Sequence, residues 1–299
     1  MSTLPTGKDG KGGTERKKVT LLTLREKRKQ GIPITMVTAY DYPSAVAGER
    51  AAIDMLLVGD SLAMVVLGYE STLQVDMDDM LLFASAVRRG ATHPFLVGDM
   101  PFLSYQADRA EAVRNAGRFL REAGMDAVKL EGGSEMVPTV EAIVRAGIPV
   151  MGHIGLTPQS ASMLGGFRVQ GKTAESARAL LDDARALQEA GCFSLVLESV
   201  PARVAQWITE QIEMPTIGIG AGKGCSGQVL VYHDLVGMFD RFTPKFVKRY
   251  AETHATLVQA LAAYKDDVEA GRFPADEHTY AIDDAEWQKL AHAKMGFAP

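Results

Sequence analysis

The amino-acid sequence predicts an α/β fold, a (β/α)8 TIM barrel, from three observations. Eight strand-length runs rich in Val, Ile and Leu recur along the chain, and none alternates cleanly between apolar and polar residues. This pattern is typical of parallel strands that are buried on both faces. Segments with apolar residues at three- and four-residue spacing lie between several of the runs, and four of these segments stop at a glycine. A doubly wound open sheet would produce the same local pattern and is the alternative fold.

The predicted strands cover residues 33–40, 54–61, 94–101, 126–133, 148–155, 193–200, 215–222 and 228–234. Helical spacing is clearest in residues 110–124, 138–147 and 175–191. Glycine just past a helix adopts the left-handed conformation that satisfies the last carbonyl groups. That role is expected for Gly90, Gly124, Gly147 and Gly191. Residues 244–271 are expected to form a long closing helix.

Three regions are expected along the 299 residues. Residues 1–18 are rich in Gly, Lys and Thr and poor in large apolar groups, so we expect a disordered N-terminal arm. Residues 19–265 contain no linker and are expected to form a single barrel domain. Residues 266–299 are expected to form a C-terminal tail.

Composition and charge exclude several classes of protein. A net charge of −5 provides no general basic field, which argues against a nucleic acid partner. No apolar run reaches membrane-spanning length, and the N-terminus lacks the apolar centre of a signal peptide. The two cysteines, Cys192 and Cys225, have no zinc-ligand spacing and suit a reducing compartment. We therefore expect a cytoplasmic protein.

Polar residues at the predicted strand ends are the candidates for a site, because catalytic groups of a TIM barrel lie at the carboxyl ends of its strands. They are Asp60, Ser61, Asp99, Lys129, Glu131, His153 and Glu198. The carboxylates of Asp60, Asp99 and Glu131 in one cavity would repel one another, and a divalent cation such as Mg²⁺ would relieve that repulsion. A salt bridge between Lys129 and Glu131, which face the same side of one strand, is the structural alternative.

Two of these candidates have a structural and a catalytic interpretation. His153 has Gly152 and Gly155 nearby, which allow close approach of a ligand, although a lone strand histidine is often structural. Glu198 ends a strongly apolar strand and is a candidate general base. An arginine-paired structural glutamate is its alternative role.

Two glycine-rich segments match nucleotide-binding patterns without the required context. Residues 166–173 match GxxxxGK[ST], but the nearest predicted strand ends about ten residues earlier. Residues 222–227 match GxGxxG, but they precede a strand-like run rather than a helix. We expect both matches to be coincidental, and the first segment to be a loop over the barrel mouth.

Several motifs together resemble the ketopantoate hydroxymethyltransferase family across roughly residues 20–250. They are VTAYDYPSA, VGDSLAM, DMPFLSY, VKLEGG, GHIGLTPQS, GGFRVQGK, LESVP, GQVLVYHD and PKFVKRY. The resemblance implies a barrel of the phosphoenolpyruvate/pyruvate type. It also implies transfer of a hydroxymethyl group from 5,10-methylenetetrahydrofolate to 3-methyl-2-oxobutanoate, which gives 2-dehydropantoate for pantothenate biosynthesis.

The same resemblance implies roles for individual residues. Asp60, Asp99 and Glu131 look like Mg²⁺ ligands, and Glu198 looks like the proton acceptor. The oxo acid would bind at Asp60, Ser61, Asp99 and Lys129, with His153 as a further contact. The family implies a homodecamer. The chain departs from the family pattern at Ala63, Ser199 and Ser226, of which the last lies in the seventh loop.

Three other functions remain open from the sequence. The first is another Mg²⁺-dependent lyase or aldolase of the same barrel type that acts on a 2-oxo acid without folate. The second is a metabolite-binding protein that has kept the fold but not the chemistry, although the presence of every matched acid and the lysine argues against it. The third is a nucleotide-binding protein that uses residues 166–173.

Overall fold

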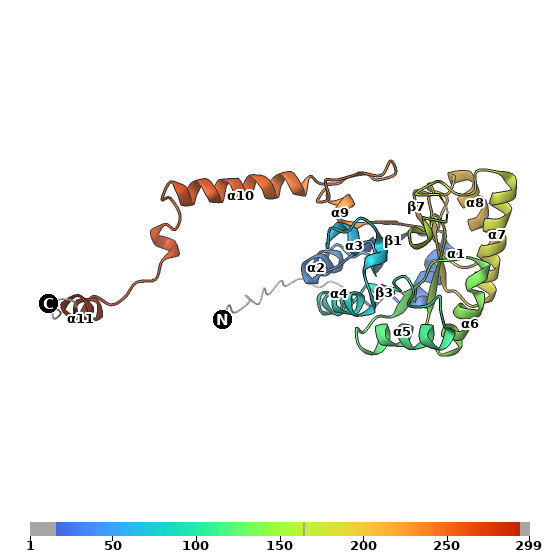
Figure 1. Ribbon diagram of the computed structural model, residues 1–299, viewed down its shortest axis with the longest axis horizontal. Coiled ribbons are helices and arrows are strands. Elements are labelled where there is room, and N and C mark those ends of the chain that lie inside the picture. Colours follow the sequence, from blue (N-terminus) through green and yellow to red (C-terminus); the bar gives the residue numbers. More distant parts are fainter. Residues whose placement is uncertain (1–15, 164, 294–299) are drawn as a thin grey trace. The chain divides into compact units, whose positions relative to one another are not determined.

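The computed structural model describes residues 16–163 and 165–293 and contains a closed barrel of eight parallel strands (Figure 1). The strands pair in sequence order, and β8 closes the barrel against β1. Their bounds are β1 Ile34–Thr38, β2 Met55–Val58, β3 Phe95–Asp99, β4 Ala127–Lys129, β5 Val150–Gly155, β6 Ser194–Glu198, β7 Thr216–Ile219 and β8 Gly227–Leu230. The predicted TIM barrel is therefore confirmed, and the open sheet is excluded.

Helices surround the strands in Figure 1 and follow most of them along the chain. They are α1 Leu21–Gln30, α2 Tyr42–Arg50, α3 Leu62–Val65, α4 Met77–Gly90, α5 Arg109–Arg121, α6 Val137–Arg145, α7 Ala174–Glu189, α8 Ala202–Gln211 and α9 Tyr232–Leu235. Side-chain caps set several of their starts. The Asp76 carboxylate accepts hydrogen bonds from the backbone amides of Asp78 and Asp79, and Thr173 caps α7 in the same way through Ser176.

The core consists of two apolar layers, as the alternation of side chains along each strand requires. One cluster fills the barrel interior and includes Met36, Met55, Val97, Met151 and Ile217. The other packs the outer face of the strands against the helices and includes Leu56, Leu96, Val128, Leu195 and Phe119. The strands are apolar on both faces for this reason.

Glycines end three helices as expected, and Gly90 has a different role. Gly124, Gly147 and Gly191 have positive φ angles of 67°, 85° and 99°. Gly90 is instead the last residue of α4, and a Cβ there would lie 2.7 Å from the carbonyl oxygen of Tyr42. Its predicted role as a left-handed cap is wrong, because the residue allows α2 to approach α4 closely.

The chain divides into two compact units, Met1–Tyr250 and Ala251–Pro299. The second unit contains α10 Thr253–Glu269, a short 3-10 helix Asp276–His278 and α11 Asp284–Ala293. The long helix expected over 244–271 thus begins nine residues later and belongs to the second unit. The division differs from the expected domain boundary after residue 265.

The expected N-terminal arm lies mostly outside the described residues. Of its last three residues, Arg16 donates hydrogen bonds to the carbonyl oxygens of Glu49 and Ile53, both at 2.8 Å. Lys18 Nζ lies 2.5 Å from Asp126 Oδ2. These residues therefore contact the barrel.

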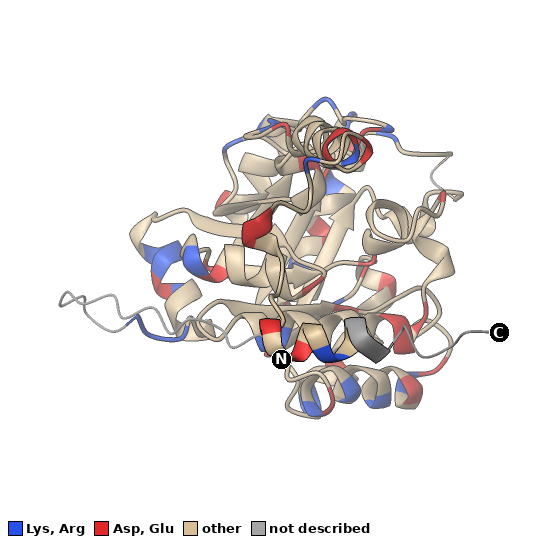
Figure 2. Ribbon diagram, turned by 90° about the vertical axis from the view of Figure 1, so that its left-hand side faces the viewer, with Lys and Arg blue, Asp and Glu red and all other residues tan. Residues whose placement is uncertain are grey.

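Charged residues are interspersed along the helices rather than gathered by sign, as the blue and red segments in Figure 2 show. This distribution agrees with the absence of a general basic field in the sequence. Within the described part of the chain, no helix is long and apolar enough to cross a membrane.

Candidate functional site

The side chains of the site follow the same inward and outward alternation along the strands as the side chains of the core. Residues two apart on a strand face the same way, so the inward position after Val97 is Asp99 and the one after Met151 is His153. Lys129 follows Ala127, and Glu198 follows Val196, by the same rule. Strands β3 to β6 therefore carry apolar side chains in the barrel interior and charged side chains at its mouth.

Glycine makes this alternation possible on β3. Gly98 faces the outer layer, and a Cβ added there would clash with the ring of Phe119 on α5. Only glycine lets the strand lie this close to the helix. Asp99, the next residue, is thereby held in the mouth of the barrel and is 1% exposed.

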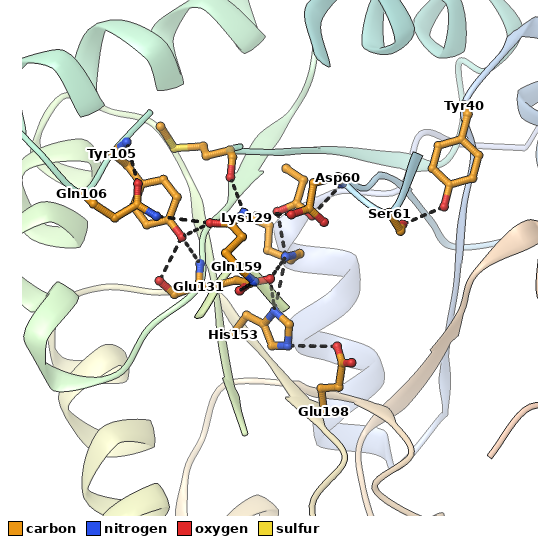
Figure 3. Close-up of polar contacts among 12 residues, drawn as sticks. Tyr40, Asp60, Ser61, Tyr105, Gln106, Lys129, Glu131, His153, Gln159 and Glu198 are labelled. Carbon is orange, nitrogen blue, oxygen red and sulfur yellow. Dashed lines mark hydrogen bonds and ion pairs between the residues drawn. The ribbon is translucent and has the colours of Figure 1, made fainter. Parts of the chain in front are cut away.

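All seven residues predicted for the site line one cavity of about 390 Å³ at the carboxyl ends of the strands. They are Asp60, Ser61, Asp99, Lys129, Glu131, His153 and Glu198. Figure 3 shows the side chains of Lys129, His153 and Glu198 in one continuous group.

Lys129 is the cationic centre of this group. Its Nζ lies 2.7 Å from Asp99 Oδ1 and 4.0 Å from Glu131 Oε1. Burial by itself lowers the pKa of Lys129, but the carboxylates of Asp99, Glu131 and Asp60 outweigh it and raise that pKa. The ammonium therefore stays charged and offsets part of the surrounding negative charge.

His153 is a second cation between two glutamates. Its Nε2 lies 3.2 Å from Glu198 Oε2, and its Nδ1 lies 3.5 Å from Glu131 Oε1 (Figure 3). Burial and the Lys129 ammonium lower the pKa of His153, but the contacts with Glu131 and Glu198 raise it to about 9. The two glutamates thus favour the protonated imidazole, whereas Lys129 Nζ, 3.3 Å from Nδ1, opposes it. The Nε2 atom faces the Glu198 carboxylate at the rim of the cavity.

Asp60 and Asp99 form an acidic pair. The Asp60 amide donates to Asp99 Oδ2 at 3.2 Å. Burial raises the pKa of Asp60 well above its usual range, and repulsion from Asp99 and Glu131 adds to the rise. Burial also raises the pKa of Asp99, although Lys129 opposes this effect. The predicted repulsion among the carboxylates is therefore present.

Sequence reasoning missed the neutral residues that organise the acids. Gln159 donates from Nε2 to Asp60 Oδ2 at 2.9 Å and from its backbone amide to Glu131 Oε2 at 3.0 Å. The Tyr105 hydroxyl accepts from the Glu131 amide at 3.1 Å, and the Tyr40 hydroxyl lies 2.8 Å from Ser61 Oγ. All three residues lie in the motifs of the family resemblance. An uncharged side chain after a strand does not by itself indicate a functional site.

The acids fit a hard cation by donor type but do not surround one. In the described part of the chain, no three or more His, Cys, Asp and Glu side chains are arranged to hold a metal ion. Each acid already has a polar partner, since Gln159 donates to both Asp60 and Glu131, and Lys129 contacts Asp99. Asp60 and Asp99 are adjacent, because the Asp60 amide donates to the Asp99 carboxylate. Mg²⁺ is commonly held by one or two carboxylates together with waters and substrate oxygens.

Neither glycine-rich segment has the context of a nucleotide site. Strand β5 ends at Gly155, eleven residues before Gly166, and β7 is followed by strand β8 rather than by a helix. Both interpretations as nucleotide-binding motifs are therefore excluded.

Comparison with known proteins gives consistent results over nearly the whole chain. A family model described as "Ketopantoate hydroxymethyltransferase" matches residues 18–276. A 3-methyl-2-oxobutanoate hydroxymethyltransferase from Moorella thermoacetica is 58% identical over 266 residues, which cover 89% of this chain and 99% of that protein. One from Syntrophobacter fumaroxidans is 55% identical over 271 residues, with 91% and 95% covered.

A solved structure shares the fold alone. It is that of 2,3-dimethylmalate lyase, a member of the PEP mutase/isocitrate lyase superfamily. It covers 92% of this chain and 95% of its own, with a TM-score of 0.52 and 15% sequence identity. This likeness agrees with the predicted eight-stranded barrel.

Proposed function

Because the chain belongs to the ketopantoate hydroxymethyltransferase family, we propose that it transfers a hydroxymethyl group from 5,10-methylenetetrahydrofolate to 3-methyl-2-oxobutanoate. The product is 2-dehydropantoate, in pantothenate biosynthesis. The observation that carries the proposal is the position of Glu198, a carboxylate at the rim of the cavity whose Oε2 lies 3.2 Å from His153 Nε2.

Glu198 is the proposed base. It takes the proton from C3 of the oxo acid, and the electron pair of that C–H bond passes to the neighbouring carbonyl to form an enolate. Lys129 and His153 offset the negative charge of the substrate carboxylate and of the enolate in a site that excludes most water. Ser61 orients the substrate from the Tyr40 side of the cavity. Water supplies the oxygen of the one-carbon unit that the folate releases as formaldehyde. The enolate carbon then attacks this formaldehyde, and the new alkoxide takes the proton from Glu198.

Mg²⁺ belongs to the proposal, with Asp60 and Asp99 as its direct ligands. The resemblance implies Glu131 as a third ligand. In our proposal its role is indirect, because its two oxygens contact Gln159 and His153. When bound, the ion would polarise the oxo group of the substrate as a Lewis acid. The surplus of carboxylates around one ammonium supports this assignment.

Deuterium exchange at C3 tests the base directly. In D₂O with Mg²⁺ and 3-methyl-2-oxobutanoate but no folate, the wild-type protein should exchange the C3 proton. Glu198→Gln should bind the oxo acid and lose exchange by about 10²–10⁴-fold. Glu175→Gln, on the outer helix α7, is the matched control. Normal exchange in Glu198→Gln would remove Glu198 as the base.

The same mixture separates the transferase from a lyase of the same barrel type. Product that forms only when methylenetetrahydrofolate is added supports the transferase. Cleavage of an oxo acid without folate would overturn the proposal.

A homodecamer is the proposed assembly. Helix α10 carries an apolar stripe at helical spacing, formed by Leu257, Leu261, Tyr264 and Val268. Such a stripe packs against another surface, and in our proposal that surface belongs to a second chain. Light scattering after size exclusion should give a mass near ten chains for the wild type and a smaller mass for Leu261→Asp. A monomeric wild-type protein would contradict the assembly.

A further inference from the structure

The strand-end residues that line the cavity are charged on one side, and on the other side they carry no charge. Strands β7, β8 and β1 contribute Ile219, Val229 and Thr38 to the cavity wall. None of these positions is charged, although they belong to the same barrel mouth as Asp99 and Lys129. The loop after α9 extends this apolar wall with Phe239, Phe242 and Phe246.

Aromatic rings are exposed along this wall. Phe242 is 69% exposed and Phe246 is 37% exposed, while Phe167 is 63% exposed in the loop after β5. A Cβ at Gly220 would lie 2.8 Å from Phe246 Cδ1, so the glycine at the end of β7 lets this ring lie against the strand. Exposed aromatic faces around an apolar cavity are typical of a site for a flat, largely apolar ligand.

One carboxyl group stands in the apolar half. Asp234, in α9 directly after β8, lines the cavity and is 8% exposed. Burial raises its pKa to about 6, and the charge of Arg249 opposes the rise. This group can therefore hold a proton close to neutral pH, as a general acid must. It follows β8, and Glu198 ends β6, so a single strand, β7, separates the two in the barrel.

We propose that the apolar half of the cavity binds the folate co-substrate, with its rings against Phe242 and Phe246, and that Asp234 is the acid that protonates the departing folate nitrogen. The inference rests on the proposed function and names the second substrate's place in the same cavity. Lys245, which also lines this wall, suits the carboxylates of a folate tail.

The proton transfers balance with water as the one further reactant. The bond between N10 and the methylene carbon breaks, and its electron pair stays on N10, which takes the proton from the Asp234 carboxyl group. Water adds to the iminium carbon left on N5 and returns a proton to the Asp234 carboxylate. The bond between that carbon and N5 then breaks, N5 takes the hydroxyl proton, and formaldehyde is released into the cavity where the enolate forms.

The Asp234 side chain is tested by separating the two half-reactions. Asp234→Asn should keep C3 deuterium exchange at the wild-type rate, because exchange needs no folate. Its kcat for folate-dependent transfer should fall by about 10²-fold, and Asp234→Glu should recover part of the loss. Equal losses of exchange and transfer in Asp234→Asn would show a structural role and overturn the inference, as would normal transfer.

The aromatic wall is tested by the KM for the folate. Phe242→Ala should raise this KM about threefold to tenfold, with C3 exchange and the KM for the oxo acid unchanged. The matched control is Leu82→Ala, because Leu82 is 67% exposed on the outer helix α4. An unchanged folate KM in Phe242→Ala would place the folate elsewhere.

The proposed function and the placement of the folate are contradicted by different results. A wild-type protein that forms no product with methylenetetrahydrofolate would contradict the proposed function itself. An active wild type whose Asp234 and Phe242 variants behave normally would contradict only the placement of the folate.

Discussion

The two halves of the cavity carry different kinds of side chain at equivalent positions of their strands. On β3 to β6 the last inward-facing residues are ionisable, whereas on β7, β8 and β1 they are Ile219, Val229 and Thr38. The backbone arrangement is the same on both sides of the mouth, so the difference lies in one side chain per strand. A barrel can therefore place charge chemistry and an apolar binding wall in one cavity without a change in topology.

The largest expected effect follows from removal of the central cation in the charged half. Lys129→Met leaves Asp99, Glu131 and Asp60 without the ammonium that offsets them, so the free energy of unfolding should fall by about 3–5 kcal/mol. Urea denaturation in the presence of a chelator measures this change. Lys245→Met, in the exposed part of the apolar half, is the control and should change little. Comparable losses of unfolding free energy in Lys129→Met and Lys245→Met would show that the two halves do not differ in electrostatic repulsion.

A smaller effect should appear as a pH dependence. His153 has a folded-state pKa of about 9, above its usual value of about 6.5. Its contribution to stability is therefore fully present below pH 6.5 and is lost as the pH rises through about 9. The free energy of unfolding should decrease over this range in the wild type. The decrease should be weaker in His153→Gln. Parallel pH profiles for the two proteins would contradict a protonated His153.

The smallest effect distinguishes the two aspartates. Burial and repulsion raise the pKa of Asp60, so Asp60→Asn should leave the metal-free protein unchanged or stabilise it by about 1 kcal/mol. The same change at Asp99 removes a partner 2.7 Å from Lys129 and should be destabilising. Both variants should lose Mg²⁺-dependent activity. Destabilisation of equal size in the two variants would show that Asp60 is not under net repulsion.

The sequence predicted the eight strands well, because strands buried on both faces leave long apolar runs. It also predicted the charged half, since an ionisable residue directly after such a run is conspicuous. It did not predict Gln159 or Asp234. The role of Gln159 depends on contacts with Asp60 and Glu131 from other strands. Asp234 ends the run predicted as the strand 228–234, but the strand stops at Leu230 and Asp234 lies in α9.

Two other predictions from the sequence were wrong. Gly90 carries the composition of a helix end but serves close packing against α2, which only the tertiary structure reveals. The closing helix begins at Thr253 rather than near Pro244, although residues 244–252 have no glycine to mark its start.

Gly98 has a consequence for how the barrel assembles. If β3 slipped by one residue during folding, Asp99 would take the place of Gly98 against the Phe119 ring, where even a methyl group does not fit. The slipped strand would also bury an ionised carboxylate in the helical layer, which costs several kcal/mol. Asp99 thus also destabilises any barrel in which β3 is out of register. The strand therefore specifies its own alignment before any ligand is present.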